Sequence, residues 1–213
     1  MTFRKCLFRR CDMNLALFDF DGTITTKESI SCFLRYLCGS DGAFYVRIMP
    51  FIPKILLYLI GLYPNWRIKQ DILAVFIKDM PETEFRQKAH KFAQSRIDMI
   101  LRKEAMDRIM WHREQGDEIV IVSAGIRDYI EPWARSNGID NVIAVELEVK
   151  EGKMTGMLDG LNCYGPEKVR RVKEALDLSK YDKIYAYGDT KGDIEMLNMA
   201  DIAFYNFRPF NSR

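Results

Sequence analysis

The sequence predicts an α/β fold in which a doubly wound parallel sheet carries an inserted, all-helical domain. Short apolar runs that end abruptly in polar turns, such as Leu15–Phe18, are typical of strands buried on both faces in the middle of a parallel sheet. Strand-like and helix-like segments alternate in the second half of the chain, which indicates right-handed β-α-β units. From residue 27 to about residue 115 the patterns are helical without a strand signal, so we expect a helical insert after the first strand.

The bulk composition is that of a soluble globular protein. The chain has 213 residues, enough for one domain with an insert, and its 48% hydrophobic and 29% charged residues allow a packed core. A net charge of +2 without a concentrated basic face gives no sign of nucleic-acid binding, so we expect no nucleic acid among the partners. Five cysteines, an odd number with no C-x-x-C pair, favour a reducing, cytoplasmic setting over a disulfide framework.

Residues 1–12 have the character of a loose basic extension. They contain four basic residues and lack the apolar stretch of a secretory signal, and Met13 is an alternative start of the chain. A weak attraction of this segment to anionic lipid is the less favoured interpretation.

Asp19 and Asp21 follow the first predicted strand directly, and Gly22 comes next. The carboxyl edge of a parallel sheet is where open α/β sheets bind their ligands. Gly22 allows the chain to turn sharply, so the two carboxylates can converge on one bound group. One of them could then hold Mg²⁺ and attack a phosphorus atom while the other transfers a proton. A D-x-D pair alone is a weak signal, because most acidic residues in such loops are solvated.

The first helix of the insert is expected from about Thr25 to Leu37. Thr25 and Glu28 have the spacing of a capping box, in which two side chains satisfy free backbone N–H groups at the start of a helix. Gly39 and Gly42 then break the helical pattern.

The stretch Phe44–Tyr63 is the most apolar in the chain and allows three interpretations. We favour a buried helix of a small helical domain. An interfacial helix could instead dip its apolar face into a bilayer while Arg47 and Lys54 reach the headgroups. A transmembrane helix is the least favoured interpretation, because each of these charges costs roughly 2.5–3.5 kcal/mol inside a membrane and Pro50 and Pro53 interrupt the pattern.

Helices and strands follow in turn over the rest of the chain. Helical patterns are expected at 66–78 and 82–100 in the insert and later at 104–115, 128–136, 166–176 and 193–199. Strand patterns are expected at 118–123, 142–149, 154–158, 184–187 and 202–205. A turn at Glu151-Gly152 should join two of these strands as a hairpin.

Polar groups gather at the ends of successive predicted strands and at the start of one helix. They are Asp19 and Asp21 after the first strand, Ser123-Ala124-Gly125 at the end of the second, Lys168 in the first turn of a helix, and Gly188–Asp193 after a later strand. Each group alone has an ordinary explanation as a helix cap or a solvated side chain. On one edge of one sheet they supply the parts that phosphoryl transfer requires. The two histidines, His90 and His112, lie in helical patterns away from these groups and indicate no metal site.

The motifs of the chain occur in the order D-F-D-G-T, S-A-G, lysine and G-D-T-K-G-D. This set resembles the haloacid dehalogenase superfamily of phosphatases, and the helical insert resembles the cap of its phosphoserine phosphatase-like branch, subfamily IB. The resemblance covers about residues 14–206. It implies a Rossmann-like core of residues 1–25 and 105–213 and an inserted C1-type cap of residues 26–104. It also implies a Mg²⁺-dependent phosphomonoester hydrolase with an aspartyl-phosphate intermediate.

The resemblance implies a role for each motif residue. Asp19 would be the nucleophile that takes up the phosphoryl group. Asp21 would protonate the leaving oxygen and then activate water, which suits a carboxyl whose pKa is raised. Lys168 would neutralise charge on Asp19 and on the phosphoryl group. The implied phosphate-binding residues are Thr23, Ser123 and Ala124.

A magnesium site is also implied by the resemblance. Its ligands would be Asp19, the main-chain carbonyl of Asp21, and Asp189, with Asp193 holding Lys168 or a metal-bound water. Mg²⁺ takes one or two carboxylates and keeps several waters, which fits this set.

Two features bear on the substrate, and they point in different directions. Glu28 lies where phosphoserine phosphatases carry a glutamate that contacts the amino acid, and Arg67 lies in the region of their carboxylate-binding arginine. The S-A-G motif and Gly192 depart from that branch. The apolar stretch Phe44–Tyr63 favours a phospholipid phosphate such as phosphatidylglycerophosphate, with peripheral contact to the inner face of a membrane. We expect a small phosphorylated metabolite such as phosphoserine, with the lipid phosphate as the alternative.

A third class of function is a phospho-accepting switch. Receiver domains also place an acceptor aspartate, an acidic Mg²⁺ pair and a lysine on a doubly wound sheet. The large helical insert would then be unexplained, and Asp21 beside the acceptor Asp19 would speed the hydrolysis that a switch must avoid. The sequence therefore favours an enzyme over a switch.

Overall fold

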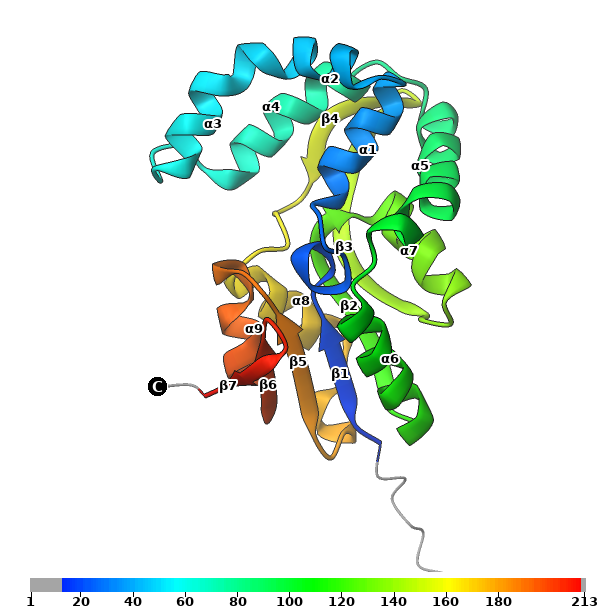
Figure 1. Cartoon of the computed structure of the whole chain (residues 1–213), viewed down its shortest axis with the longest axis vertical. Helices are drawn as coiled ribbons and strands as arrows, with labels where there is room; N and C mark the ends of the chain where they lie inside the picture. The colour runs from blue at the N-terminus through cyan, green and yellow to red at the C-terminus, as the bar shows by residue number, and fades with distance from the viewer. Residues whose placement is uncertain (1–12, 212–213) are drawn as a thin grey trace, which may run out of the picture.

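The computed structural model describes residues 13–211, and within them the chain forms a seven-stranded sheet (Figure 1). The basic extension expected at residues 1–12 lies outside the described residues. The strands are β1 (Leu15–Phe18), β2 (Glu118–Ile126), β3 (Asn141–Lys150), β4 (Lys153–Asp159), β5 (Ile184–Gly188), β6 (Ile202–Tyr205) and β7 (Arg208–Phe210).

The strand order across the sheet is β4-β3-β2-β1-β5-β6-β7. Strands β3, β2, β1, β5 and β6 are parallel, and the edge strands β4 and β7 run antiparallel to their neighbours. The chain moves from β1 outward through β2 to β3 and then returns past β1 to β5, so β1 lies at the topological switch point where such sheets bind ligands. All four residues of β1 are fully buried, as expected for a central strand. The predicted α/β class is confirmed, and β7 is a strand that the sequence patterns did not indicate.

Nine α-helices of six to fifteen residues complete the described part, together with short 3₁₀ and π turns. The α-helices are α1 (Ser29–Cys38), α2 (Asp41–Ile48), α3 (Ile52–Leu59), α4 (Asn65–Ile77), α5 (Glu82–Arg96), α6 (Lys103–Gln115), α7 (Arg127–Ser136), α8 (Pro166–Ala175) and α9 (Ile194–Met199). Figure 1 shows α1 to α5 beyond the carboxyl ends of the strands, while α6 to α9 flank the sheet. The expected insertion of helices after the first strand is confirmed.

The start of α1 differs from the predicted capping box. The helix begins at Ser29, and Glu28 makes no side-chain hydrogen bond to its backbone. Thr25 is extended and donates its hydroxyl to the carbonyl oxygens of Phe20 and Lys27 instead. The capping box is wrong because residues 20–24 form a separate π turn, which moves the start of the helix four residues along the chain.

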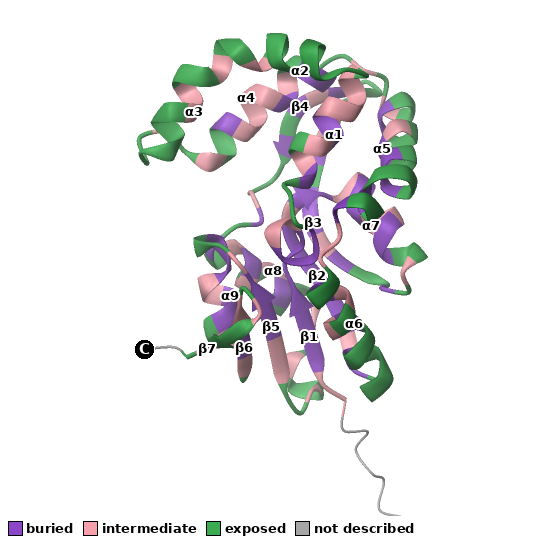
Figure 2. Cartoon of the chain, in the orientation of Figure 1, coloured by how far each residue is buried: buried purple, intermediate pink, exposed green. Residues whose placement is uncertain are grey.

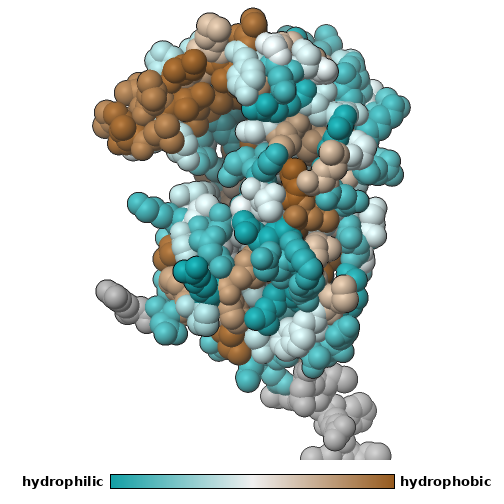
Figure 3. Space-filling view, in the orientation of Figure 1, coloured by the Kyte–Doolittle hydropathy of each residue, from teal (hydrophilic) through white to brown (hydrophobic). Residues whose placement is uncertain are grey.

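The apolar stretch Phe44–Tyr63 is largely exposed, so the prediction of a buried helix is wrong. It lies in α2, a 3₁₀ turn at Met49–Phe51 and α3, and Phe44 is its one buried residue. The continuous helical segment Asp41–Leu59 is long and apolar enough to cross a membrane, and only 6% of its most apolar window is buried. Figure 2 shows α3 as an exposed arm, and Figure 3 shows that its surface is hydrophobic.

The β3–β4 hairpin fastens the helical layer to the sheet. The Asp79 N–H donates to the Met154 carbonyl, the Met154 N–H to that of Met80, and the Glu82 N–H to that of Gly152, each at 2.9 Å. These bonds lie between α4 and α5, so both helices are tied to β4. The division into a core of residues 1–25 and 105–213 and a cap of residues 26–104 stays a prediction. Strand β4 lies within the predicted core range, but it contacts both the sheet and the inserted helices α4 and α5.

Gly156 brings β4 into close contact with α4. Its φ is +81°, and a Cβ added there would lie 2.4 Å from the Ala74 Cα atom. Only glycine satisfies both the left-handed conformation and the short distance between the two backbones.

Gly156→Ala is therefore expected to destabilise the fold. Alanine at positive φ costs about 1–2 kcal/mol, and the clash with Ala74 adds on the order of 2 kcal/mol. Gly152→Ala is the matched control, because its φ is +72° and nothing lies within 4 Å of the added Cβ. Urea denaturation should show a clearly larger loss of unfolding free energy for Gly156→Ala. Equal losses would contradict the close packing of α4 on β4.

Candidate active site

The site begins where β1 ends. Asp19 is nearly fully buried, and its N–H donates to the Tyr187 carbonyl at 2.9 Å, which keeps it in line with β5. Residues 20–24 then turn sharply, with Gly22 at φ +85°. A Cβ on Gly22 would lie 2.1 Å from a carboxylate oxygen of Asp189, so glycine allows Asp189 to approach this turn.

Lys168 is buried against Asp19, as the motif order predicts. Its Nζ donates to Asp19 Oδ1 at 2.5 Å, to Asp193 Oδ1 at 2.7 Å and to the Val122 carbonyl at 2.7 Å. Burial alone would lower the pKa of Lys168, but the carboxylates of Asp19 and Asp193 outweigh it and raise the pKa. The ammonium group therefore stays charged and uses all three of its donors.

Asp193 holds both Lys168 and the loop after β5. Its Oδ1 accepts from Lys168, and its Oδ2 accepts from the Asp189 N–H at 3.2 Å and from the N–H and hydroxyl of Thr190 at 2.9 Å each. Both carboxylate oxygens are thus occupied by protein donors. The arrangement matches the expectation that Asp193 holds Lys168, and it leaves little lone-pair capacity for a metal ion.

The residues that could hold a metal ion gather on the same side of Asp19. Asp19, Asp189 and Asp193 each offer a carboxylate oxygen, and these oxygens lie within 4.8 Å of one another. Burial raises the pKa of Asp189, which accepts a hydrogen bond from the Thr23 hydroxyl at 3.0 Å and has no ion-pair partner among the described residues. A half-buried carboxyl without a cation and an all-oxygen donor set fit a hard divalent ion such as Mg²⁺.

Asp21 is directed away from this acidic cluster. Its Oδ1 accepts the Ser29 N–H at 2.7 Å, so Asp21 satisfies a free N–H at the start of α1. Burial raises the pKa of Asp21, and the hydrogen bonds from Ser29 oppose that shift. The two aspartates of the first motif therefore have different environments, one paired with Lys168 and one with a helix start.

Ser123 lies fully buried at the end of β2. Residues 123–125 leave the regular ladder, because the pairing of β2 with β3 shifts register between Val122 and Ile126. The Gly125 N–H donates to the Ser123 Oγ at 2.8 Å. A Cβ on Gly125 would lie 3.4 Å from Asp21 Oδ2, so the serine loop and the first motif share one site, as predicted.

A cleft of about 500 Å³ opens over these residues between the sheet edge and α1 to α4. Its polar end contains the predicted residues Asp19, Asp21, Glu28, Ser123, Ala124, Lys168 and Asp193. Thr23 and Asp189 lie just beneath, joined by their hydrogen bond. The structure thus brings these sequence-predicted residues together in one cleft.

Lys69 is a site residue that sequence reasoning missed. It reaches the polar end from α4, donates to the Ala124 carbonyl, and lies 3.4 Å from the Asn162 side-chain oxygen. Burial lowers the pKa of Lys69 to about 8, although Asp21 raises it. Arg67, the predicted cation of this region, does not line the cleft and lies over the Trp66 ring. The one available signal was the position of Lys69 between Ile68 and Ile72 on the inner side of α4.

Glu28 lines the same cleft as Lys69. Burial and the nearby charges of Asp21 and Asp189 raise the pKa of Glu28 to about 7, and Lys69 opposes the shift. Glu28 does not cap α1 as predicted, and it lines the cleft instead. Glu28 and Lys69 thus present an acid and a base to a bound molecule.

The other end of the cleft is apolar. It is lined by eight large apolar side chains from α1 to α4, namely Ile30, Leu34, Phe44, Ile48, Ile55, Tyr58, Ile68 and Ile72. These side chains come from the helices that Figure 1 shows beyond the carboxyl ends of the strands. The cleft therefore joins a charged end to a hydrophobic end.

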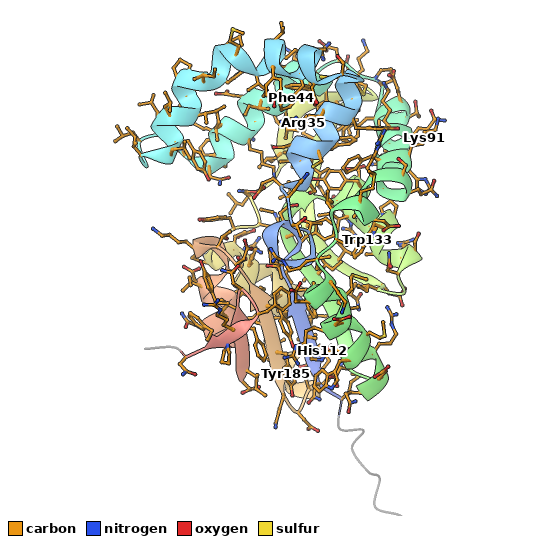
Figure 4. All side chains as sticks on the ribbon, viewed as in Figure 1. Arg35, Phe44, Lys91, His112, Trp133 and Tyr185 are labelled. Carbon is orange, nitrogen blue, oxygen red and sulfur yellow. The ribbon has the colours of Figure 1, made fainter. Side chains whose placement is uncertain are left out.

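His112 lies outside the site, as the sequence predicts. Its ring is fully buried and bonds to Asp117 Oδ2 at 2.7 Å and to the Tyr187 hydroxyl at 2.9 Å. Figure 4 shows it beside Tyr185 near the amino ends of the strands, far from the helical layer. Burial lowers the pKa of His112, so the ring is a neutral packing residue.

The profile of the haloacid dehalogenase-like hydrolases matches residues 16–198, which span every motif of the site. The chain belongs to this family. Protein CicA of Caulobacter vibrioides is 34% identical over 188 residues, which are 88% of this chain and 83% of CicA. The chain is therefore a hydrolase of the haloacid dehalogenase type, and this membership favours an enzyme over the non-enzymatic switch.

Solved structures show the same fold. A Bordetella pertussis protein of unknown function has a TM-score of 0.78 at 23% identity, with 91% of this chain and 89% of that chain covered. A substrate-bound phosphoserine phosphatase has a TM-score of 0.61 at 24% identity, with 90% and 84% covered. The haloacid dehalogenase-like phosphatase fold of the phosphoserine phosphatase branch is confirmed.

Lys69→Met is expected to stabilise the protein near pH 7. The pKa of Lys69 is about 8 in the folded chain and about 10.4 in an unfolded one. Below pH 8, folding therefore buries the charged ammonium group of Lys69, which lowers the free energy of unfolding. The variant should gain about 1–2 kcal/mol, allowing for solvent in the cleft. Between these two pKa values the unfolded wild-type chain binds more protons than the folded one, so the unfolding free energy of the wild type rises with pH. The difference in stability between Lys69→Met and the wild type therefore shrinks as the pH rises.

Urea denaturation at about pH 7 and about pH 10 measures this difference. Lys78→Met is the control, because Lys78 is exposed just after α4. A variant that is less stable than wild type at pH 7, or a difference independent of pH, would contradict the burial of the Lys69 charge.

Proposed function

We propose that the protein is a Mg²⁺-dependent phosphomonoester hydrolase whose substrates carry an apolar group, as lipid phosphates do. The observation that carries this proposal is the composition of the cleft, whose charged end at Asp19 continues into an end lined by eight apolar side chains. A phosphate monoester bound at Asp19 would place its alcohol portion along that apolar end. Ligand sites of this kind combine a mostly apolar lining with a few placed polar groups.

Asp19 is the proposed nucleophile. One of its carboxylate oxygens attacks phosphorus, the bond from phosphorus to the ester oxygen breaks, and the leaving alkoxide takes a proton from Asp21. Water then attacks the phosphorus of the aspartyl phosphate, Asp21 takes a proton from that water, and the carboxylate of Asp19 is restored as phosphate leaves. Burial raises the pKa of Asp19 well above its ordinary value, and the ion pair with Lys168 opposes that shift, which supports the role of a nucleophile.

Asp21 is the proposed acid and base. A carboxyl group must be protonated to donate a proton at neutral pH, and burial raises the pKa of Asp21 in that direction. The Ser29 N–H holds one oxygen of Asp21 and leaves the other directed toward the Ser123 loop. The site thus separates two carboxylates by environment, as two-step phosphoryl transfer requires.

The remaining polar residues position the phosphate and the metal ion. We propose that Ser123 and the backbone around Ala124 bind phosphoryl oxygens, and that Thr23 orients Asp189 through their hydrogen bond. Asp19, Asp189 and the main-chain carbonyl of Asp21 would hold Mg²⁺. When bound there, Mg²⁺ neutralises part of the charge on the phosphoryl group.

Phosphoserine is the second candidate substrate, and Glu28 and Lys69 favour it. An acid and a base in the polar end match the ammonium and carboxylate groups of an amino acid. A small zwitterion would fill only this end and leave the apolar end without a ligand. We therefore place the lipid phosphate first.

Asp19→Asn should abolish turnover of any phosphomonoester by at least about 10⁴-fold while leaving the fold intact, because the amide cannot act as the nucleophile. Asp21→Asn should slow turnover strongly as well, with the protein trapped in its phosphorylated form. Asp182→Asn, an exposed aspartate away from the site, is the control. Phosphate release with Mg²⁺, and its loss in EDTA, are the measurements, and activity of Asp19→Asn near that of wild type would contradict the proposed chemistry.

A series of alkyl phosphates tests the substrate class. From ethyl to decyl phosphate, each kept below its micelle concentration, kcat/KM should rise with chain length, because every buried CH₂ adds about 0.8 kcal/mol of binding. Ile48→Ser with Ile55→Ser should lower kcat/KM for decyl phosphate on the order of tenfold and leave ethyl phosphate unchanged. Met49→Ser, exposed on the same segment and outside the cleft, is the control. A flat series with a higher kcat/KM for L-phosphoserine would favour the second candidate.

A further inference from the structure

The exposed apolar side chains of the described chain are concentrated in one region. Eleven of the eighteen exposed large hydrophobic residues lie between residues 45 and 66. We define the apolar face by the seven that are aliphatic, are exposed by more than 40% and lie on α2, α3 or the turns beside them outside the cleft: Val46, Met49, Ile52, Leu56, Leu59, Ile60 and Leu62. Figure 3 shows a continuous hydrophobic surface over α3. Soluble proteins rarely expose such a cluster without a partner.

Every side chain of α3 except Lys54 is apolar, although only one side of the helix packs against protein. Ile55 and Tyr58 line the cleft, while Leu56, Leu59 and Ile60 are exposed by 57%, 69% and 68%. A helix that is hydrophobic all round is normally buried in a core or in a membrane. We therefore expect an apolar partner to cover the outer side of α3.

The charges around the apolar face are mostly positive. Of the four basic residues in 41–70, Lys54 is paired with Asp71 and Lys69 lines the cleft, which leaves Arg47 and Arg67. Arg47 and Arg67 lie over the rings of Phe76 and Trp66, and within the described part of the chain neither has a carboxylate partner. Basic and aromatic side chains around an apolar helix are the composition of a membrane-surface helix, and anionic headgroups attract such a segment.

We infer that the apolar face docks on an anionic lipid bilayer, so that the cleft opens at the membrane surface. This inference rests on the proposed function, because a lipid phosphate in the bilayer would then enter the apolar end of the cleft between α1 and α4. A second copy of the chain fits the face less well, since a symmetric pair would bring its basic side chains together without acidic partners.

The docked helix lies on the bilayer and does not span it. Lys54 in α3 forms an ion pair with Asp71 in α4 at 2.6 Å, and the Tyr63 hydroxyl bonds to the same carboxylate at 2.8 Å. Spanning would separate these groups and remove Ile55 and Tyr58 from the cleft. Contact through one side of α2 and α3 preserves all of these interactions.

Vesicle flotation of the full chain tests the inference. The Asp19→Asn background prevents turnover, so binding is measured apart from catalysis. This protein should float with vesicles of phosphatidylcholine and phosphatidylglycerol and less with phosphatidylcholine alone. Leu59→Ser with Ile60→Ser should weaken flotation at least tenfold. Met99→Ser with Met110→Ser is the matched control, because these side chains are 73% and 54% exposed elsewhere, and it should float as the parent does.

Two further measurements make each outcome decisive. With Asp19 restored, the Leu59 and Ile60 variant should hydrolyse ethyl phosphate at the wild-type rate, which shows that it is folded. Sedimentation velocity without lipid should give the same mass for parent and variant. Flotation unchanged by these substitutions would overturn the inference. So would absence of vesicle binding together with a dimer that the substitutions dissociate, which would identify a second copy as the partner.

The docking inference and the proposed substrate class fail separately. If alkyl phosphates show no preference for long chains while flotation depends on Leu59 and Ile60, the substrate class is wrong and the docking stands. If the chain-length preference holds and flotation does not occur, the docking is wrong and the substrate class stands.

Discussion

The buried ion pair of Lys168 with Asp19 and Asp193 is the interaction on which the rest of the site depends. Lys168 starts in α8, Asp19 ends β1, and Asp193 closes the loop after β5, so a single ammonium group joins three elements at the carboxyl edge of the sheet. An uncompensated charge in this place would cost several kcal/mol, which forces the three groups to remain together. Lys168 also opposes the rise that burial causes in the pKa of the Asp19 carboxyl, as suits a nucleophile.

The helical layer determines what the charged edge can act on. The β3–β4 hairpin ties α4 and α5 to the sheet, and α4 carries Lys69 to the polar end of the cleft. Burial of Lys69 with a pKa near 8 is unfavourable to folding, and functional sites commonly retain such residues at the expense of stability. Helices α1 to α4 contribute the apolar end of the cleft, and the outer side of α3 is a hydrophobic surface.

The sheet and the acidic end of the site were predictable from the sequence, because buried parallel strands and the polar residues at their ends leave local patterns. Asp19, Asp21, Ser123, Lys168 and Asp193 all line one cleft for this reason. The helical layer was less predictable. Periodicity shows that Phe44–Tyr63 is apolar but cannot say what covers it, and its exposure depends on tertiary packing. Spacing alone suggested a capping box for Glu28, yet the π turn moved the start of α1, and nothing local distinguishes Lys69 from Arg67.

Identification of the phosphorylated residue tests the central claim about Asp19 most directly. The wild-type enzyme would be mixed with a soluble phosphomonoester and Mg²⁺, quenched in acid and reduced with borohydride, which converts an aspartyl phosphate to homoserine. Mass spectrometry of the peptide that contains Leu15–Phe18 should then find homoserine at position 19 and aspartate at position 21. Homoserine at another aspartate, or phosphate release with no modified residue at any quench time, would contradict catalysis through Asp19.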